Sequence, residues 1–196
     1  MSSKYIKNHS DFYGVRLFNT FDIHNFVSMQ KVFLGLGTNL GDREACLKSA
    51  IECISESIGH VVSISSVYET EPWGFSSDDQ FLNMAVEVET SLKPSGLLGR
   101  MLMIEARMGR LRSGTGYSSR LIDLDILLYG NNILNTKSLV IPHPRLHERK
   151  FVLVPLCEIA PDLVHPVLGR NIKTLLKECR DKGKVRLHDC TIQGTQ

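Results

Sequence analysis

The 196-residue chain lacks several features that would mark a specialised class of protein. It has no apolar run near the ~20 residues that a membrane-spanning helix needs. It has no excess of one charge, because its formal net charge is +2, so any anion site must come from local clustering. Its five cysteines form no C-x-x-C pair, which predicts reduced thiols in a cytoplasmic protein. With 42% hydrophobic and 22% charged residues, the composition is that of a soluble globular protein.

The two ends of the chain differ from its middle. Residues 1–28 show no helical or strand periodicity and lack the apolar core of a signal peptide, which predicts an unpacked N-terminal extension. Residues 29–186 are long enough for one domain of ordinary size. Residues 187–196 are predicted to form a polar tail.

Hydrophobic periodicity predicts six elements before the proline-rich part of the chain. Strands are expected at 32–36, 61–68, 83–90 and 121–129, and helices at 42–58 and 94–109. The order β-α-β-β-α-β is typical of the ferredoxin-like α+β fold, with its helices on one face of the sheet. A C-terminal extension with a short helix near 172–179 follows. Gly35 and Gly37 precede Leu40, where a dinucleotide fingerprint needs glycine, so a tight strand-to-helix turn is the favoured interpretation.

The last predicted strand carries Asp123 and Asp125. Successive strand residues point to opposite faces, so the two carboxylates share one face about 7 Å apart, while Ile122, Leu124, Ile126 and Leu128 share the other. Paired carboxylates on a rigid strand can hold Mg²⁺ together with substrate phosphates. The alternative is a solvated strand face with two unrelated acids.

An arginine cluster precedes this strand. Guanidinium groups match phosphate geometry and stay charged at working pH, so Arg110, Arg112 and Arg120 are predicted to contact phosphates. Together with the acids they indicate a nucleotide polyphosphate. Residues 113–116 could form a loop that closes over it. A basic solvated loop is the alternative.

A further segment, Thr70-Glu-Pro-Trp73-Gly, is followed by Phe81-Leu-Asn83. An aromatic ring and a side-chain amide can stack on a flat heterocycle and pair with its edge. Trp73 and Phe81 could equally be core residues.

These motifs, in this order, resemble the 6-hydroxymethyl-7,8-dihydropterin pyrophosphokinase family from about Lys31 to Arg186. The segments that carry the resemblance are Gly35-Leu-Gly-Thr-Asn-Leu-Gly-Asp42, Tyr68 to Gly74, Phe81-Leu-Asn83, Glu105 to Arg112, Arg120-x-x-Asp-x-Asp125, Pro142-His143-Pro-Arg145 with Arg149 and Phe151, and Glu158 to Pro161.

The resemblance implies a folate-pathway transferase that moves diphosphate from ATP to the pterin hydroxymethyl group and releases AMP. It implies two Mg²⁺ ions, small-molecule substrates, and neither nucleic acid nor membrane as partner; other folate enzymes are candidate partners. The metal ligands correspond to Asp123 and Asp125, which with Arg110 and Arg120 form the catalytic set. The implied ATP-binding residues are Glu105, Arg110, Arg112, Arg120, Ile126, His143 and Arg149. The implied pterin-binding residues are Thr70, Trp73, Phe81, Asn83, Tyr117 and Phe151.

One segment departs from the family pattern. Many members carry Trp-Gly-Pro-Arg before the aspartate pair, with another basic residue ahead of the Trp, whereas this chain has Gly116-Tyr-Ser-Ser-Arg120. Tyr117 can still stack, but the additional loop cation is absent.

Two other classes of function fit a ferredoxin-like domain. An RNA-binding module would carry aromatic and basic residues on its central strands, where this chain has acids. A non-catalytic domain that binds a small regulatory ligand would not need Asp123 and Asp125.

Overall fold

The computed structural model describes residues 28–72, 80–109, 121–190 and 192, so the predicted extension lies almost entirely outside the described residues. The first part of the fold alternates strands and helices: β1 (Gln30–Thr38), α1 (Arg43–Ser57), β2 (His60–Ile64), β3 (Tyr68–Thr70), β4 (Phe81–Thr90), α2 (Pro94–Arg107) and β5 (Asp123–Tyr129). The second part comprises β6 (Leu134–Asn135), β7 (Val140–Ile141), the 3₁₀ helix η1 (Leu146–Glu148), α3 (Lys150–Ile159), α4 (Ile172–Glu178) and β8 (Val185–Leu187).

The strands form a mixed α/β fold around an antiparallel sheet. The strand order is β5-β1-β4-β3-β8, and β2 pairs with β4 beyond the end of β3. Strand β1 therefore lies between β4 and the edge strand β5, and is antiparallel to both. Strands β6 and β7 form a separate hairpin.

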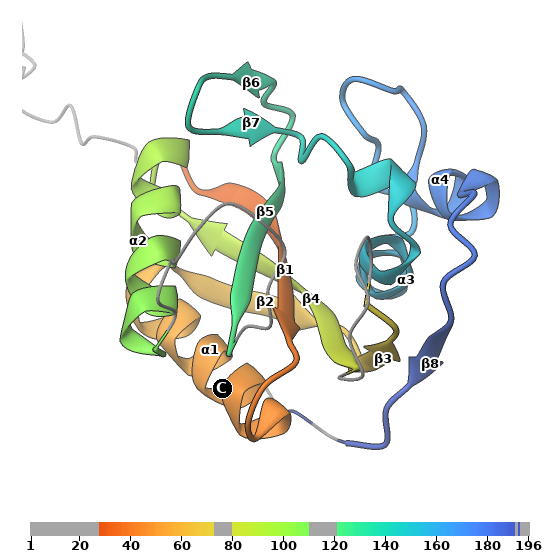
Figure 1. The fold of residues 1–196 in the computed structure, drawn as a ribbon. Coiled ribbons are helices and arrows are strands. Elements are labelled where there is room, and N and C mark those ends of the chain that lie inside the picture. The colour runs from red at the N-terminus through yellow and green to blue at the C-terminus, as the bar shows by residue number, and fades with distance from the viewer. Residues whose placement is uncertain (1–27, 73–79, 110–120, 191, 193–196) are drawn as a thin grey trace, which may run out of the picture.

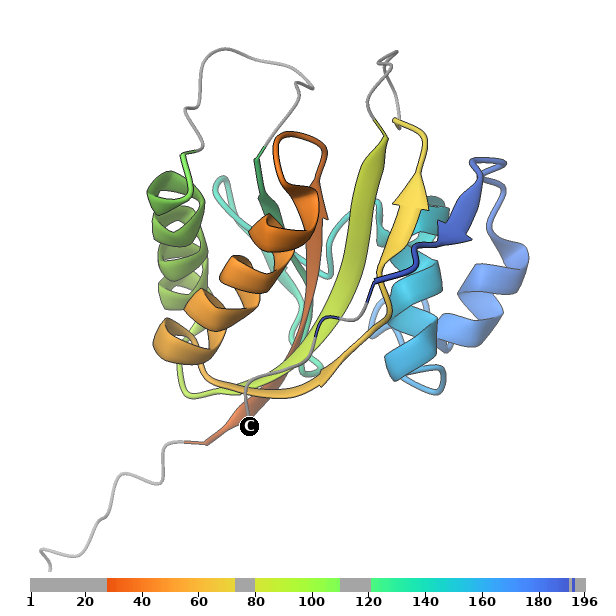
Figure 2. The ribbon, with the colours of Figure 1, turned by 90° about the horizontal axis from the view of Figure 1, so that it is seen from below.

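The sheet has helices on both faces (Figures 1 and 2). Helices α1 and α2 cover one face, here called the covered face, while α3 packs on part of the other face and α4 packs against α3. Each face has its own buried apolar cluster. The sequence prediction of helices on one face therefore holds for α1 and α2, while the C-terminal extension brings its helices to the opposite side.

Local sequence explains where α1 begins and what it buries. The side chain of Asp42 caps the helix by accepting the N–H of Ala45 at 3.0 Å. Leu47, Ile51 and Ile54 recur at helical spacing and are buried against the sheet. The predicted helix at 42–58 is thus confirmed to within a residue at each end.

The structure differs from the sequence prediction in two segments. The single strand expected at 61–68 is two strands, because the backbone leaves the β4 edge between Ile64 and Tyr68. Helix α3 was not predicted, because Pro155 lies inside it and proline normally interrupts a helix. Its apolar side chains pack on the sheet, and the free energy of this burial outweighs the local cost of the proline.

Among the helices of the described residues, none is long and apolar enough to cross a membrane.

Candidate active site

The two aspartates lie on β5, on the face opposite α1 and α2. Leu124 and Ile126, which alternate with them, are buried in the apolar cluster of the covered face. Asp123 and Asp125 therefore face the other side of the sheet, here called the polar face. The side chain of Asp125 is 41% exposed, so this carboxylate is open to a ligand.

A β-bulge limits how far the predicted alternation extends. The pairing of β1 with β5 shifts at Phe33/Leu34, so one additional β5 residue is accommodated there. Leu128 consequently packs in the polar-face cluster with Leu127, although the sequence predicted it on the same face as Leu124. The bulge follows the aspartates and leaves their alternation intact.

Gly37 of β1 leaves an open backbone floor between Asp123 and Asn83, here called the glycine floor, whereas the Leu127 side chain covers Gly35. Gly37 pairs with Asp123 on one side and Asn83 on the other, and Gly35 pairs with Asp125. Directly paired residues share a face, so no β1 side chain stands between Asp123 and Asn83, which are two strand spacings, or about 10 Å, apart. The sequence interpretation took Gly35 to Gly41 as a strand-to-helix turn that overlaps the end of the strand expected at 32–36, so it placed Gly37 beyond that strand. The period-two spacing of the two glycines within an apolar run was the signal for a strand with an open face.

The β4 side of the floor ends in a buried amide. Asn83 and Thr70 are 6% and 4% exposed, and the Asn83 Nδ2 donates to the Thr70 Oγ1 at 2.8 Å. A Cβ atom placed on Gly37 would lie 3.2 Å from the Asn83 Oδ1, so this oxygen lies over the glycine floor. Phe81 pairs with Thr70 at the end of β4. The structure therefore brings Thr70, Phe81 and Asn83 together, and their role in binding a pterin stays a prediction.

His143 comes to the aspartates from the C-terminal extension. Its backbone N–H donates to the carbonyl of Leu127 at 2.9 Å, which fixes it beside β5. Its Nε2 lies 3.9 Å from Asp125 Oδ2, and its Nδ1 accepts the N–H of Arg145 at 3.2 Å. Burial, with Arg149 and Arg145 nearby, lowers the pKa of His143 to about 4, against an opposing effect of Asp123. The imidazole is therefore neutral near pH 7, with its proton on the Nε2 that faces Asp125.

Arg149 lies close to both Asp125 and an aromatic ring. Its Nη1 lies 3.9 Å from Asp125 Oδ2, and its guanidinium carbon lies 5.6 Å from the centre of the Phe151 ring. Arg149 is only 5% exposed, so its position is set by packing. A guanidinium so placed can pair with a phosphate that reaches Asp125.

Two predicted ATP-binding residues, Glu105 and Ile126, have buried side chains. Glu105 is 3% exposed, and its carboxylate accepts the N–H of Leu124 at 3.0 Å, so it supports β5 between the two aspartates. The side chain of Ile126 is buried in the cluster of the covered face. Only its backbone is left for contact with a ligand on the polar face.

Five predicted site residues lie outside the described residues. Arg110, Arg112, Tyr117 and Arg120 belong to the connection between α2 and β5, and Trp73 to the connection between β3 and β4. Their roles stay predictions.

The donor set on β5 fits magnesium. Asp123 and Asp125 offer only carboxylate oxygens, which hard divalent cations prefer. The neutral His143 adds no positive charge that would oppose a cation. Arg149 provides a counter-charge suited to phosphate rather than to metal.

Comparison with known proteins extends this description. The family described as 7,8-dihydro-6-hydroxymethylpterin-pyrophosphokinase (HPPK) matches residues 33–161. A relative from Methylorubrum extorquens, a 2-amino-4-hydroxy-6-hydroxymethyldihydropteridine pyrophosphokinase, is 43% identical over 160 residues, 81% of this chain and 99% of the relative. The protein of the same name from Aquifex aeolicus is 40% identical over 150 residues, 76% of this chain and 92% of the relative.

A solved structure agrees at the level of fold. An HPPK-DHPS chain from Plasmodium falciparum superposes with a TM-score of 0.63 at 18% identity, over 77% of this chain and 44% of that chain. This chain thus spans less than half the length of that solved protein. On the family match and the two relatives together, the chain belongs to the 7,8-dihydro-6-hydroxymethylpterin-pyrophosphokinase family.

Proposed function

We propose that this protein transfers the diphosphate of ATP to the hydroxymethyl group of 6-hydroxymethyl-7,8-dihydropterin and releases AMP, a step of folate biosynthesis. One observation carries the proposal beyond family membership. Asp123 and the amide of Asn83 lie on one face of the sheet, and only the backbone of Gly37 separates them. No β1 side chain therefore blocks a flat ring that binds next to a polyphosphate.

The reaction forms one bond and breaks one. The hydroxymethyl oxygen attacks the β-phosphorus of ATP, the bond from that phosphorus to the oxygen of AMP breaks, and the hydroxyl proton is lost to solvent. Two Mg²⁺ ions, when bound, neutralise phosphate charge and acidify the attacking hydroxyl. Asp123 and Asp125 are the residues that would hold them. No covalent intermediate with the protein is needed, so the protein contributes positioning and charge.

Residues around Asp125 are suited to orient the phosphates. Arg149 is fixed by burial and can pair with a phosphate oxygen near Asp125. The neutral His143 presents its Nε2–H to the same region as a donor. We assign the remaining phosphate contacts to Arg110, Arg112 and Arg120, all in the connection between α2 and β5.

The β4 side is suited to the pterin. Asn83 donates one amide N–H to Thr70, and its Oδ1, which lies over Gly37, can accept an N–H from the edge of a pterin ring. Phe151, beside Arg149, offers an apolar surface for the ring. Phe81, Trp73 and Tyr117 are assigned to the same pocket.

Several broader features belong to the same proposal. The order of strands β5-β1-β4-β3 supports a ferredoxin-like topology for the first part of the chain. Residues 29–186 would form the catalytic domain, working in the cytoplasm.

A folic acid synthesis protein of Pneumocystis carinii, 41% identical over 157 residues, matches over only 21% of its own length. Joint action with other folate enzymes is therefore a reasonable expectation for this chain.

An assay of AMP formation tests the proposed function against its rivals. Purified protein with ATP and Mg²⁺ should release AMP only when the pterin alcohol is added, and 31P NMR should show its diphosphate ester. An RNA-binding module or a regulatory domain would release no AMP in either case. Release of ADP in place of AMP would show attack at the γ-phosphorus and would refute the proposal.

A further inference from the structure

A second group of metal-binding side chains lies away from the polar face. Glu44, in the first turn of α1, meets His188 and Cys190 from the segment after β8. Their nearest ligand atoms all lie within 4.8 Å of one another, which holds for no other group of three His, Cys, Asp or Glu among the described residues. The His188 Nε2 and the Glu44 Oε1 are 2.9 Å apart.

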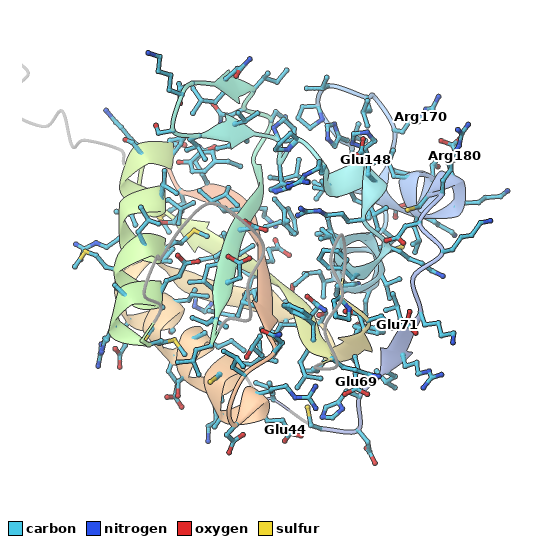
Figure 3. The ribbon with its side chains drawn as sticks, in the orientation of Figure 1. Glu44, Glu69, Glu71, Glu148, Arg170 and Arg180 are labelled. Atoms are coloured by element: carbon cyan, nitrogen blue, oxygen red, sulfur yellow. The ribbon has the colours of Figure 1, made fainter. Side chains whose placement is uncertain are left out.

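Contacts outside the group hold its members in place. Strand β8 pairs with β3, and the N–H of His188 then donates to the carbonyl of Val67 at 2.9 Å. The N–H of Cys190 donates to the carbonyl of His188 at 2.9 Å, and the half-buried Cys190 side chain packs against the apolar cluster of the covered face. Figure 3 shows Glu44 at the end of α1 beside this part of the chain. The cluster is therefore formed without a ligand.

The types of ligand atom indicate which metal ion would bind. A thiolate, an imidazole and a carboxylate are the ligands of zinc, whereas magnesium takes oxygen ligands only. Zinc bonds of about 2.0–2.3 Å in a tetrahedron place ligand atoms roughly 3–4 Å apart, so the side chains need only small movements. Three protein ligands would leave the fourth position for water.

We propose that Glu44, His188 and Cys190 bind one Zn²⁺ ion, which fastens the C-terminal segment to the start of α1. The site shares no residue with the aspartate pair, so it serves the fold rather than the transfer reaction. On binding, the thiol of Cys190 releases its proton to solvent and the sulfur bonds the metal. A hydrogen-bonded pair of His188 and Glu44, next to an unrelated thiol, is the simpler alternative.

Cobalt tests the proposal because a thiolate ligand gives Co²⁺ an intense charge-transfer absorption that oxygen ligands do not. The reduced full-length protein is titrated with Co²⁺ in excess Mg²⁺, which occupies carboxylate sites. One equivalent should develop this band, and Zn²⁺ should abolish it. At a hundredfold excess over its dissociation constant, Zn²⁺ should raise the melting temperature by about 5–10 °C.

Variants separate this site from adventitious binding. Cys190→Ser should remove the band, and His188→Gln should weaken Co²⁺ binding at least tenfold. Cys157→Ser is the matched control, because Cys157 is also a half-buried thiol but packs in the other apolar cluster, and it should behave as the parent protein. Absence of the band in the parent protein, or its persistence in folded Cys190→Ser, would overturn the proposal. The parent titration decides the question even where a variant fails to fold.

Discussion

The two faces of the sheet differ in the side chains they carry, and β5 shows this difference residue by residue. On the covered face, Leu124 and Ile126 are buried with the side chains of α1 and α2. On the polar face, Asp123 and Asp125 have no part in either apolar cluster. If the proposed function is right, one strand supplies stability on one side and catalytic residues on the other, so substitutions at adjacent positions should have opposite consequences.

The largest expected effect is on catalysis, in Asp123→Ala and Asp125→Ala. Losing either carboxylate misplaces the bound phosphates, and misplacement of this kind costs ~10²-fold in rate or more. Neither side chain fills the core, so the melting temperature should stay unchanged or rise slightly. AMP release across a Mg²⁺ series measures the rate, and raising Mg²⁺ should restore little of it.

Leu124→Ala is the matched control on the same strand. Removing a buried leucine typically costs about 2–5 kcal/mol of stability, while the folded fraction should keep its turnover. Near-normal turnover in a folded aspartate variant, or unfolding of both aspartate variants, would show that the two faces do not divide as described.

The next effect concerns the pterin end of the polar face. Asn83→Ala leaves the edge of the ring unpaired, which costs ~1–3 kcal/mol in pterin affinity. ATP affinity should hardly change, because Asn83 lies across the glycine floor from the aspartates. Calorimetry with each substrate separately measures both affinities, and a loss confined to ATP would reverse the assignment of the two ends.

A smaller effect is expected from Gly37→Ala. The new Cβ would lie 3.2 Å from the Asn83 Oδ1 and would displace that oxygen by a few tenths of an ångström, weakening pterin binding by about 1 kcal/mol. Gly99→Ala is the control, since no atom lies within 4 Å of its new Cβ. Equal pterin affinity in the two variants would mean that the glycine floor is not part of the pocket.

The pH dependence of stability should carry a contribution from His143. Its folded pKa of about 4 lies below the ordinary 6.5, so between these values the unfolded chain binds more protons and stability falls as the pH falls. His143→Gln removes this term, and its melting temperature should decline less steeply from pH 6.5 to 4. Parallel melting curves for the two proteins would contradict a buried neutral imidazole.

The smallest effect, close to none, is expected from removing residues 1–28. These residues lie outside the resemblance and show no periodicity, so a protein that begins at Met29 should keep its turnover and its melting temperature. A drop of more than ~4 °C, about 1 kcal/mol or more for a domain of this size, would show that the segment packs on the sheet.

The sequence predicted what depends on local pattern. Helix α1 was predictable from its apolar spacing, and the placement of Asp123 and Asp125 followed from strand alternation. Long-range packing accounts for what was missed. Helix α3 forms despite Pro155 because the sheet binds its apolar side, and Leu128 changes face because of a bulge that only the pairing with β1 creates.

The candidate site shows the same limit. The resemblance named His143 and Arg149, but only the folded chain shows that both approach Asp125 and that His143 is neutral. The glycine floor was missed because its function lies in the side chains it lacks, and this has meaning only once β4 and β5 are placed on either side of β1.

We propose that the polar face holds metal ions and ATP through Asp123 and Asp125. The number of bound Mn²⁺ ions, measured by electron paramagnetic resonance, tests this most directly, because Mn²⁺ is an oxygen-binding substitute for Mg²⁺. The nucleotide is α,β-methylene ATP, in which a methylene group replaces the oxygen of the bond to be broken, so no transfer occurs. We expect two ions in each complex of the parent protein, and weaker binding or a lower count in Asp123→Ala and Asp125→Ala. The same count and affinity in all three proteins would contradict it.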